Sequence, residues 1–271
     1  MKRPYPYLTL LIGTLSLFMQ ANSQATLDTS YATQINYIFA NVDKSRIPYG
    51  ILIDYGMEFT DLRQFNGTAP LADSNKCDLA AFYDVYNSLV MSRANNTVTI
   101  FSRQGNLDSI WFGYRQPGRI TLMGLFVNYS KFKENASPNY ITIINNRLYD
   151  KFVNGVWQNP YETERAFIIC PSVHQYAGRS FEVLLPSILF IKNVPSYTLS
   201  IDFHDGQGYR TLAAGTPLNV GYADTGVYKW TYRINVGGTN YYCESLIHIR
   251  PSHSSNPHAV IRQKNKRIYE S

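Results

Sequence analysis

The chain has 271 residues, of which 45% are hydrophobic and 14% aromatic, and its formal net charge is +6. Lys2 and Arg3 carry two of these charges and residues 250–271 carry a net four, so residues 24–249 are formally neutral. A neutral body has no charge-based affinity for nucleic acid, and its length is sufficient for two domains with hydrophobic cores.

Residues 1–23 have the features of a secretory signal peptide. Lys2 and Arg3 form a basic start, residues 8–19 are mostly apolar, and Ala21-Asn22-Ser23 places small residues before a cleavage site. The apolar run is shorter than the roughly 20 residues that a membrane span needs. A buried N-terminal helix is the alternative. We expect a mature chain that starts near Gln24, has no membrane span, and is secreted or held at a bacterial cell surface or in the periplasm.

Residues 24–158 are expected to form an α+β module. Two stretches in its first half have apolar residues at helical spacing. The first would be capped by Thr33 and end at Pro48, and the second, "CDLAAFYDVYNSLVMSRA", would be capped by Ser74 or Asn75. The apolar positions are Ile35, Ile38, Phe39 and Val42 in the first helix, and Leu79, Phe82, Tyr86 and Leu89 in the second.

From about residue 97 the apolar residues recur at every second position, which predicts strands. Four strand-like stretches are separated by Gly, Pro and Asn: "TVTIFS", "RITLMGLFVNYS", "NYITIINN" and "RLYDKF". The next stretch, "QNPYET" at 158–163, has the composition of a linker. We therefore expect a domain boundary there.

Residues 163–250 are expected to form a second domain. Short strand-like stretches recur there with Gly-containing turns between them: "RAFIIC", "SFEVLL", "ILFIKN", "YTLSIDF", "LNVGY", "VYKWTYRINV" and "NYYCESLIHI". This spacing, with no helical stretch, predicts an antiparallel β-sandwich of two sheets. Residues 251–271 lose the pattern and collect Ser, His, Pro, Lys and Arg, which predicts a disordered basic tail.

Part of this second domain, "LSIDFHDGQGYRTL" with the later "TPLNVGYADTGVYKWTYRI", resembles the PKD-type immunoglobulin-like domain of exported bacterial proteins. That family has an aromatic-Gly-Asp-Gly turn after one strand, and a later aromatic before a Gly-x-aromatic that opens a long strand. His204 stands where the family has glycine. The signature residues are Asp202, Phe203, His204, Asp205, Gly206, Tyr222, Gly226 and Tyr228.

The PKD resemblance covers residues 165–250 and implies an Ig-like sandwich that serves as a spacer, an adhesion module or a carbohydrate-contact module. Residues 30–160 look similar to the leading segment of large exported bacterial proteins, and that resemblance implies no activity. The fold expected for the whole chain is therefore β-rich, with an α+β module followed by a PKD-type antiparallel sandwich.

Two groups of carboxylates could carry chemistry, and neither belongs to a complete motif. Asp54 with Glu58 or Asp61 could form a hydrolase dyad, although a solvated acidic surface is the expected interpretation. Asp202 and Asp205 offer two carboxylates, whereas a calcium site needs roughly six or more oxygens. The Asp205-Gly206 pair is therefore expected to be a turn.

Three cysteines are too few and too widely spaced for a disulfide framework or a zinc site. Export would allow a disulfide between Cys170 and Cys243, which both lie in strand-like stretches. Three free buried thiols are the alternative. Cys170 also precedes His174 by four residues, but a buried thiol beside a surface histidine is the expected interpretation.

Together these patterns predict a non-catalytic exported module, a spacer or adhesion module that contacts a protein or glycan at a cell surface. We expect no catalytic residue, no cofactor, no metal and no nucleic acid partner. Two alternatives remain open: a non-catalytic leader of a larger exported hydrolase, or a carbohydrate-binding module that uses some of the abundant tyrosines.

Overall fold

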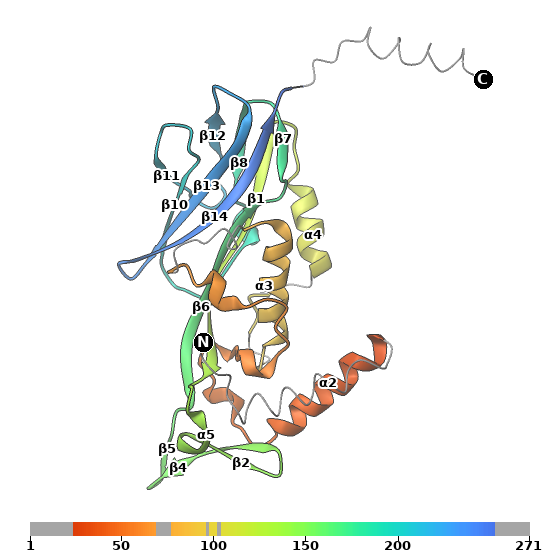
Figure 1. Cartoon of the computed structure of the whole chain (residues 1–271), viewed down its shortest axis with the longest axis vertical. Helices are drawn as coiled ribbons and strands as arrows, with labels where there is room; N and C mark the ends of the chain where they lie inside the picture. Colours follow the sequence, from red (N-terminus) through yellow and green to blue (C-terminus); the bar gives the residue numbers. More distant parts are fainter. Residues whose placement is uncertain (1–23, 69–76, 96–97, 102–103, 253–271) are drawn as a thin grey trace, which may run out of the picture.

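The computed structural model of the chain describes residues 24–68, 77–95, 98–101 and 104–252. The predicted signal peptide and residues 253–271 of the predicted basic tail lie outside the described residues. The described part is β-rich, with a few helices and several sheets. None of its helices is long and apolar enough to cross a membrane. Figure 1 shows an elongated molecule, with the two large sheets at one end and small hairpins at the other.

β1 (Arg119–Phe132) is the longest strand and organises the first five-stranded sheet. One of its edges pairs antiparallel with β6 (Tyr161–Pro171) from Leu122 to Phe132. The other edge pairs in parallel with β8 (Ser180–Leu184) and β9 (Phe190–Lys192), and β12 (Leu218–Gly221) pairs with β8. Further along that edge, Leu52 bridges to Ser130. β1 therefore joins the large sheets to the N-terminal segment.

The second five-stranded sheet has the order β11-β10-β13-β14-β7. The long β13 and β14 form an antiparallel hairpin, and β7 adds to β14 in parallel. The bounds of its strands are β7 (Gln175–Ala177), β10 (Thr198–Asp202), β11 (Tyr209–Thr211), β13 (Gly226–Val236) and β14 (Thr239–Arg250).

The two sheets face each other across one hydrophobic core. Phe181 of β8 lies 6.3 Å from Trp230 of β13, and Phe126 of β1 lies 5.4 Å from Tyr241 of β14, between ring centroids. Helices α3 (Leu79–Met91) and α4 (Gln104–Gly113) lie beside β1, away from the second sheet (Figure 1).

The burial patterns of the strands reflect this layering. β1 is buried at almost every position, because helices cover one of its faces and the second sheet covers the other. β13 and β14 alternate between buried and partly exposed residues, because only one of their faces meets the core.

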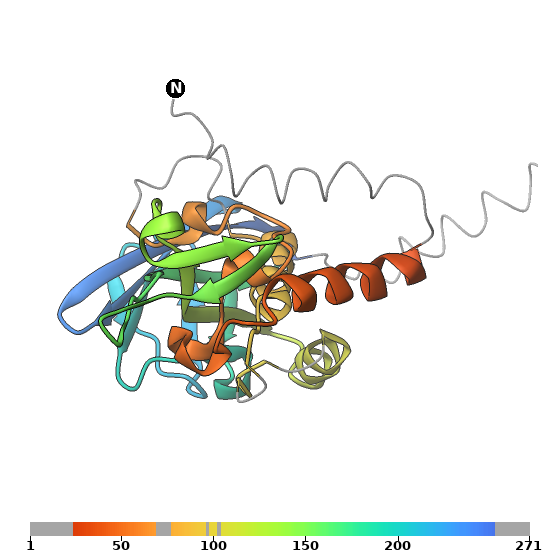
Figure 2. The same cartoon turned by 90° about the horizontal axis from the view of Figure 1, so that it is seen from below.

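The other end of the molecule has its own smaller core, with Phe39, Phe132 and Tyr161 among its members. It is built from α2 (Gln24–Ile38), α5 (Ala136–Asn139) and two hairpins, and both views show α2 extending away from the rest (Figures 1 and 2). The hairpins are β2 (Ile141–Ile144) with β3 (Arg147–Asp150), and β4 (Phe152–Val153) with β5 (Val156–Trp157). Short 3₁₀ helices span Lys44–Arg46, Pro48–Gly50, Ile53–Tyr55, Leu62–Phe65 and Ser187–Leu189.

The helix boundaries differ from those expected. Thr33 lies inside α2, which ends at Ile38 rather than at Pro48, because the chain turns there to pack Phe39 against Tyr55. Asp78 caps α3 by accepting a hydrogen bond from the Ala81 amide, whereas Ser74 and Asn75 lie outside the described residues.

Residues 98–101, expected to be a strand, have no regular structure, and the helix α4 that follows was not expected. Its sequence, "QGNLDSIWFG", has weak helical propensity, and packing of the buried Leu107 offsets this.

The expected linker at 158–163 is corrected by the pairing of β6. Tyr161 to Thr163 belong to that strand, and the Pro160 carbonyl accepts a hydrogen bond from the Lys133 amide, so the ladder with β1 continues to its end. The expected all-antiparallel pairing is corrected as well. β1 precedes the domain boundary expected at 158–163, yet it belongs to the first sheet. The connections from β1 to β8 and β9 are long enough for these strands to pair with it in parallel.

Candidate functional site

The signature turn of the second sheet is held together by short-range contacts. The Asp202 carboxylate accepts a hydrogen bond from the His204 amide at 2.8 Å, and the Asp205 carboxylate accepts one from the Gln207 amide at 3.2 Å. His204 is exposed and has a φ of 55°, and Gly206 has a φ of 85°. His204 therefore occupies the left-handed region that favours glycine.

Arg210 forms an ion pair with the second oxygen of the Asp205 carboxylate, Oδ2. The guanidinium lies 2.6 Å from Asp205 Oδ2, the Asp205 side chain is 0% exposed, and the same guanidinium covers the Phe203 ring at 4.6 Å. No group of three or more His, Cys, Asp or Glu side chains in the described ranges is arranged to hold a metal ion. Asp202 and Asp205 thus act on the local backbone and on Arg210.

The aromatic signature residues connect this turn to the core. The Tyr222 hydroxyl donates to the Phe203 carbonyl at 2.7 Å and accepts from the Trp230 indole at 2.7 Å. The Tyr228 ring stacks on Tyr222, and Gly226 begins the long strand β13. These residues have a structural role, because their polar groups are engaged with one another.

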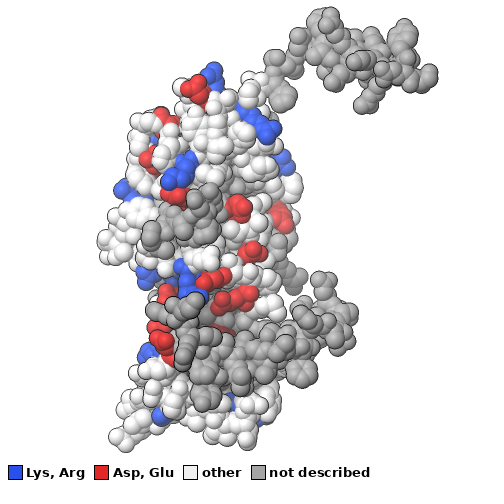
Figure 3. All heavy atoms as spheres, in the orientation of Figure 1, with Lys and Arg blue, Asp and Glu red and all other residues white. Residues whose placement is uncertain are grey.

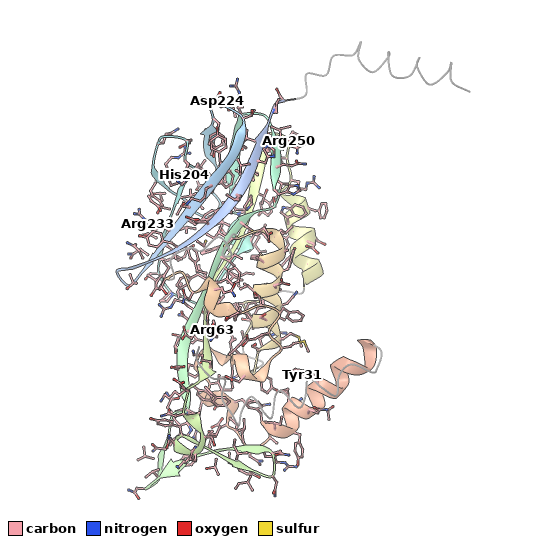
Figure 4. All side chains as sticks on the ribbon, viewed as in Figure 1. Tyr31, Arg63, His204, Asp224, Arg233 and Arg250 are labelled. Atoms are coloured by element: carbon pink, nitrogen blue, oxygen red, sulfur yellow. The ribbon has the colours of Figure 1, made fainter. Side chains whose placement is uncertain are left out.

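A different group of carboxylates lines a cavity of about 450 Å³ near the far ends of β1 and β6. We call this cavity the carboxylate cleft. One wall is the segment from Ile53 to Arg63, the other is the hairpin β2–β3 with α5, and the β1–β6 ladder lies between them. Figure 3 shows acidic and basic atoms side by side on the middle of the molecule, and Figure 4 places Arg63 well away from His204.

Asp54 is the most enclosed carboxylate of the cleft. Its Oδ2 accepts a hydrogen bond from the Phe132 amide at 2.8 Å, and the nearby bridge between Leu52 and Ser130 holds its segment against β1. Burial raises the pKa of this carboxyl above its usual value. The expected solvated surface is therefore corrected for Asp54, because long-range pairing with the end of β1 encloses it.

Glu58 and Asp61 lie in the same wall and have opposite pKa shifts. Burial, and then the charges of Asp61 and Asp54, raise the pKa of the Glu58 carboxyl. Asp61 accepts two hydrogen bonds of 2.8 Å from the Arg63 guanidinium, and these contacts lower the pKa of Asp61. Asp61 is thus paired, whereas the described residues contain no ion pair of Asp54 or Glu58.

Lys131 of β1 forms ion pairs across the β1–β6 ladder. Its ammonium lies 3.2 Å from Glu162 and 3.3 Å from Glu164, both on β6. Burial alone would lower the pKa of Lys131, but the hydrogen bonds that its ammonium donates to these two carboxylates, with their charges, outweigh burial and raise it. Lys131 therefore stays charged and already has its counter-charges.

Tyr129 lies two residues before Lys131 and lines the same cavity. The residue is 2% exposed, yet its hydroxyl makes no hydrogen bond within the part of the chain that the structure describes. Burial, and then the charges of Glu164, Glu58 and Asp61, raise the pKa of the phenol. It remains protonated and has an unused capacity for hydrogen bonding.

The rest of the lining is mostly apolar. Side chains of the N-terminal wall, β1 and the hairpin form it: Ile53, Leu62, Phe132, Ala136, Ile141, Ile143 and Leu148. A cavity of this size, with an apolar surface and a few convergent polar groups, is typical of a site for a small ligand or a side chain.

The expected cysteine pairing is not formed. Cys77, Cys170 and Cys243 are free buried thiols, and burial raises the pKa of Cys170 and Cys243. The Cys243 thiol is hydrogen-bonded to Cys77, which the backbone bond from Cys77 to Glu244 brings against β14. Cys170 is fully buried whereas His174 is exposed, so these two residues form no reactive pair.

No protein family, curated protein sequence or solved structure matches this chain. The carboxylate cleft is therefore the feature of the molecule that indicates its function.

Sequence reasoning considered Asp54, Glu58 and Asp61 and missed Tyr129, Lys131, Glu162 and Glu164. A signal was present in both strands. Tyr129 and Lys131 flank Ser130 in "NYSKF" of β1, and Glu162 and Glu164 flank Thr163 in "YETE" of β6, so each pair lies on one face of its strand. The linker interpretation of 158–163 concealed this pairing.

Proposed function

We propose that the chain is an exported, non-catalytic interaction module whose ligand binds in the carboxylate cleft. The observation that carries this proposal is the cleft itself, about 450 Å³ with an apolar lining, an enclosed carboxylate and a tyrosine whose hydroxyl makes no hydrogen bond among the described residues. A spacer needs no such cavity, whereas a binding module does.

The two facing sheets support the cleft in this proposal. A PKD-type sandwich made of the second sheet and the strands β6, β8, β9 and β12 would provide a rigid body. β1 extends from this body, and its last residues form one side of the cleft. A site on paired strands is held more precisely than a site on a loop.

The ionic groups of the cleft favour binding over catalysis. Arg63 and Lys131 are held by carboxylates in fixed pairs, and the cleft contains no histidine among its described lining residues. Pre-formed ion pairs give a ligand defined positions for its polar groups. The same contacts leave these cations little freedom to move protons.

A thermal-shift screen tests the proposed function. Oligosaccharides and short peptides would be added to the purified chain, because a ligand of the native state raises the melting temperature. Ile143→Trp fills the cleft with a larger side chain, and Ile188→Trp makes the same change at an exposed site outside it. We expect Ile143→Trp to abolish the shift and Ile188→Trp to retain it. An equal shift in both variants would contradict the proposal.

Hydrolysis is a second candidate, favoured by one observation. Asp54 has a raised pKa and Asp61 a lowered pKa in the same cleft, which is the division of roles that an acid and its partner carboxylate require. Turnover of chromogenic glycosides or esters that Asp54→Asn abolishes without lowering the melting temperature would replace the binding proposal.

A further inference from the structure

We propose that the group recognised by the cleft is an organic cation on an apolar stem, a primary ammonium or guanidinium of the kind that ends a lysine or arginine side chain. This inference rests on the proposed function, since it names the ligand of the same cleft. Charge, shape and one unused hydroxyl support it independently of one another.

The charges of the lining residues leave carboxylates in excess. Five acidic residues and three basic residues line the cavity. Arg63 is held by Asp61, and Lys131 is shared between Glu162 and Glu164. The Lys133 ammonium donates to the Asn159 carbonyl at 2.6 Å and lies over the Tyr140 ring. Asp54 and Glu58 therefore have no cation of their own in the described residues, and a ligand cation would supply one.

The apolar residues determine the shape of the ligand. Phe132, Ile141 and Leu148 are buried members of the smaller core and also line the cavity. Ile53 and Leu62 line it from the opposite wall. An ammonium between Asp54 and Glu58 would place a chain of methylene groups between these two walls. A bare metal ion would leave that apolar surface unused, and the described residues contain no metal-binding cluster.

The Tyr129 hydroxyl provides the second polar contact. It lies in the cavity lining, on a residue that is 2% exposed, and makes no hydrogen bond within the described residues. A phenol oxygen accepts hydrogen bonds, and ammonium and guanidinium groups only donate them. Glu58 and Asp61 lie close enough to affect the charge of this phenol. Tyr129 and Glu58 line the same cavity, so a cation bound there has the Tyr129 hydroxyl available as an acceptor.

Isothermal titration calorimetry with matched probes tests this assignment. N-acetyl-lysine methylamide represents a lysine side chain in a protein, n-butylamine represents the same ammonium and stem as a free small amine, and N-acetyl-norleucine methylamide has the same stem without charge. We expect the two cationic probes to bind and the norleucine probe to bind at least about tenfold more weakly, as befits the loss of a charge-assisted hydrogen bond. Tighter binding of the lysine probe than of n-butylamine would identify a protein as the source of the cation, and the reverse order a free amine.

Three variants complete the test. Asp54→Asn and Glu58→Gln each remove one negative charge at nearly constant size, and we expect each to weaken binding of the cationic probes by about tenfold. Asp224→Asn removes one charge from an exposed residue outside the cleft and should leave affinity unchanged. Glu58 is exposed, so its substitution tests the proposal even if Asp54→Asn disturbs the fold.

Equal affinity for the lysine and norleucine probes, or full affinity in Glu58→Gln, would overturn the cationic ligand. Absence of binding by every cationic probe would do so as well. If a neutral or anionic ligand from the thermal-shift screen then binds and Ile143→Trp abolishes that binding, the proposed function holds and only the ligand class is wrong. If Ile143→Trp affects no binding at all, both fail.

Discussion

Two acidic regions of this molecule are similar in sequence and different in surroundings. The signature turn contains Asp202 and Asp205, and the cleft contains Asp54, Glu58 and Asp61. In the turn, the carboxylates are engaged by amides two residues away and by Arg210, five residues away. In the cleft, the amide that contacts Asp54 belongs to Phe132, 78 residues away.

This difference explains which region is suited to binding. Short-range partners form wherever the turn forms, so the carboxylates of this turn are engaged by its own residues. Partners brought from distant segments enclose a carboxylate without satisfying all of it. Asp54 therefore has a raised pKa, and partial burial with the charges of Asp61 and Asp54 raises the pKa of the neighbouring Glu58; such groups in a cavity are candidates for a functional site.

The largest difference between the two regions should be in stability. Asp205→Ala leaves the Arg210 charge, whose side chain is 20% exposed, without its partner, and we expect a loss of about 3 kcal/mol. Glu58→Ala removes an exposed carboxylate without an ion pair and should change stability by less than about 0.5 kcal/mol. Urea denaturation of both variants measures the two free energies. Similar losses in both would mean that the turn and the cleft do not differ in this way.

A smaller effect is expected from the hydroxyl that joins the turn to the core. Tyr222→Phe leaves the Trp230 indole without its acceptor in a buried position, which should cost about 2 kcal/mol. Tyr228→Phe removes an exposed hydroxyl that donates to the Asp224 carbonyl, and it should cost less than about 0.5 kcal/mol. Thermal unfolding of the two variants gives the comparison, and equal costs would argue against the structural role of Tyr222.

The sequence predicts the buried face of the second sheet better than it predicts the strand pairing of the first. Alternation in "VYKWTYRINV" predicts that Trp230 and Tyr232 share a face, and both are fully buried in β13. β1 is buried on both faces, so its apolar run carries no information about which strands lie beside it. Its pairing with β6 depends on contacts across an intervening segment of about 30 residues, which periodicity does not report.

The candidate site was predictable only in part for the same reason. The three acids of "IDYGMEFTDLR" are visible in the sequence, and their enclosure is not. Enclosure results from the bridge between Leu52 and Ser130 and from the hairpin β2–β3, which forms the opposite wall. The carboxylates of the turn could be interpreted locally, because the observed partners of Asp202 and Asp205 lie within five residues.

The pH dependence of stability should have opposite signs for two carboxyls of the cleft. The pKa of Asp54 is raised in the folded state, so its buried anion destabilises the fold at neutral pH, and this penalty disappears as pH falls toward the usual value of 3.8. The pKa of Asp61 is lowered by Arg63, so its stabilisation exists above 3.8 and is lost as pH falls through the folded value. Lys131 faces both carboxyls and acts in the same direction on each.

Urea denaturation between pH 3 and pH 7 separates these two contributions. Asp54→Asn should raise stability at neutral pH and reduce the gain on acidification, whereas Asp61→Asn should lower stability at neutral pH and reduce the loss on acidification. The two variants remove the same charge from the same cleft, so each is a control for the other. Parallel changes would show that both carboxyls are equally solvated.

The smallest effect concerns His204, the residue of the turn that stands where the PKD-type pattern has glycine. Its φ of 55° is unfavourable for a side chain that lies exposed, so His204→Gly should stabilise the protein by up to about 1 kcal/mol. Gly206→Ala, at a φ of 85° with open space around the added methyl group, should destabilise it by about 1 kcal/mol for the same reason. Opposite signs in thermal unfolding, with cleft binding unchanged in both variants, would establish that this turn has a purely structural role. Loss of ligand binding in His204→Gly would instead place part of the function in the turn, because that substitution removes an imidazole from the surface and no contact from the core.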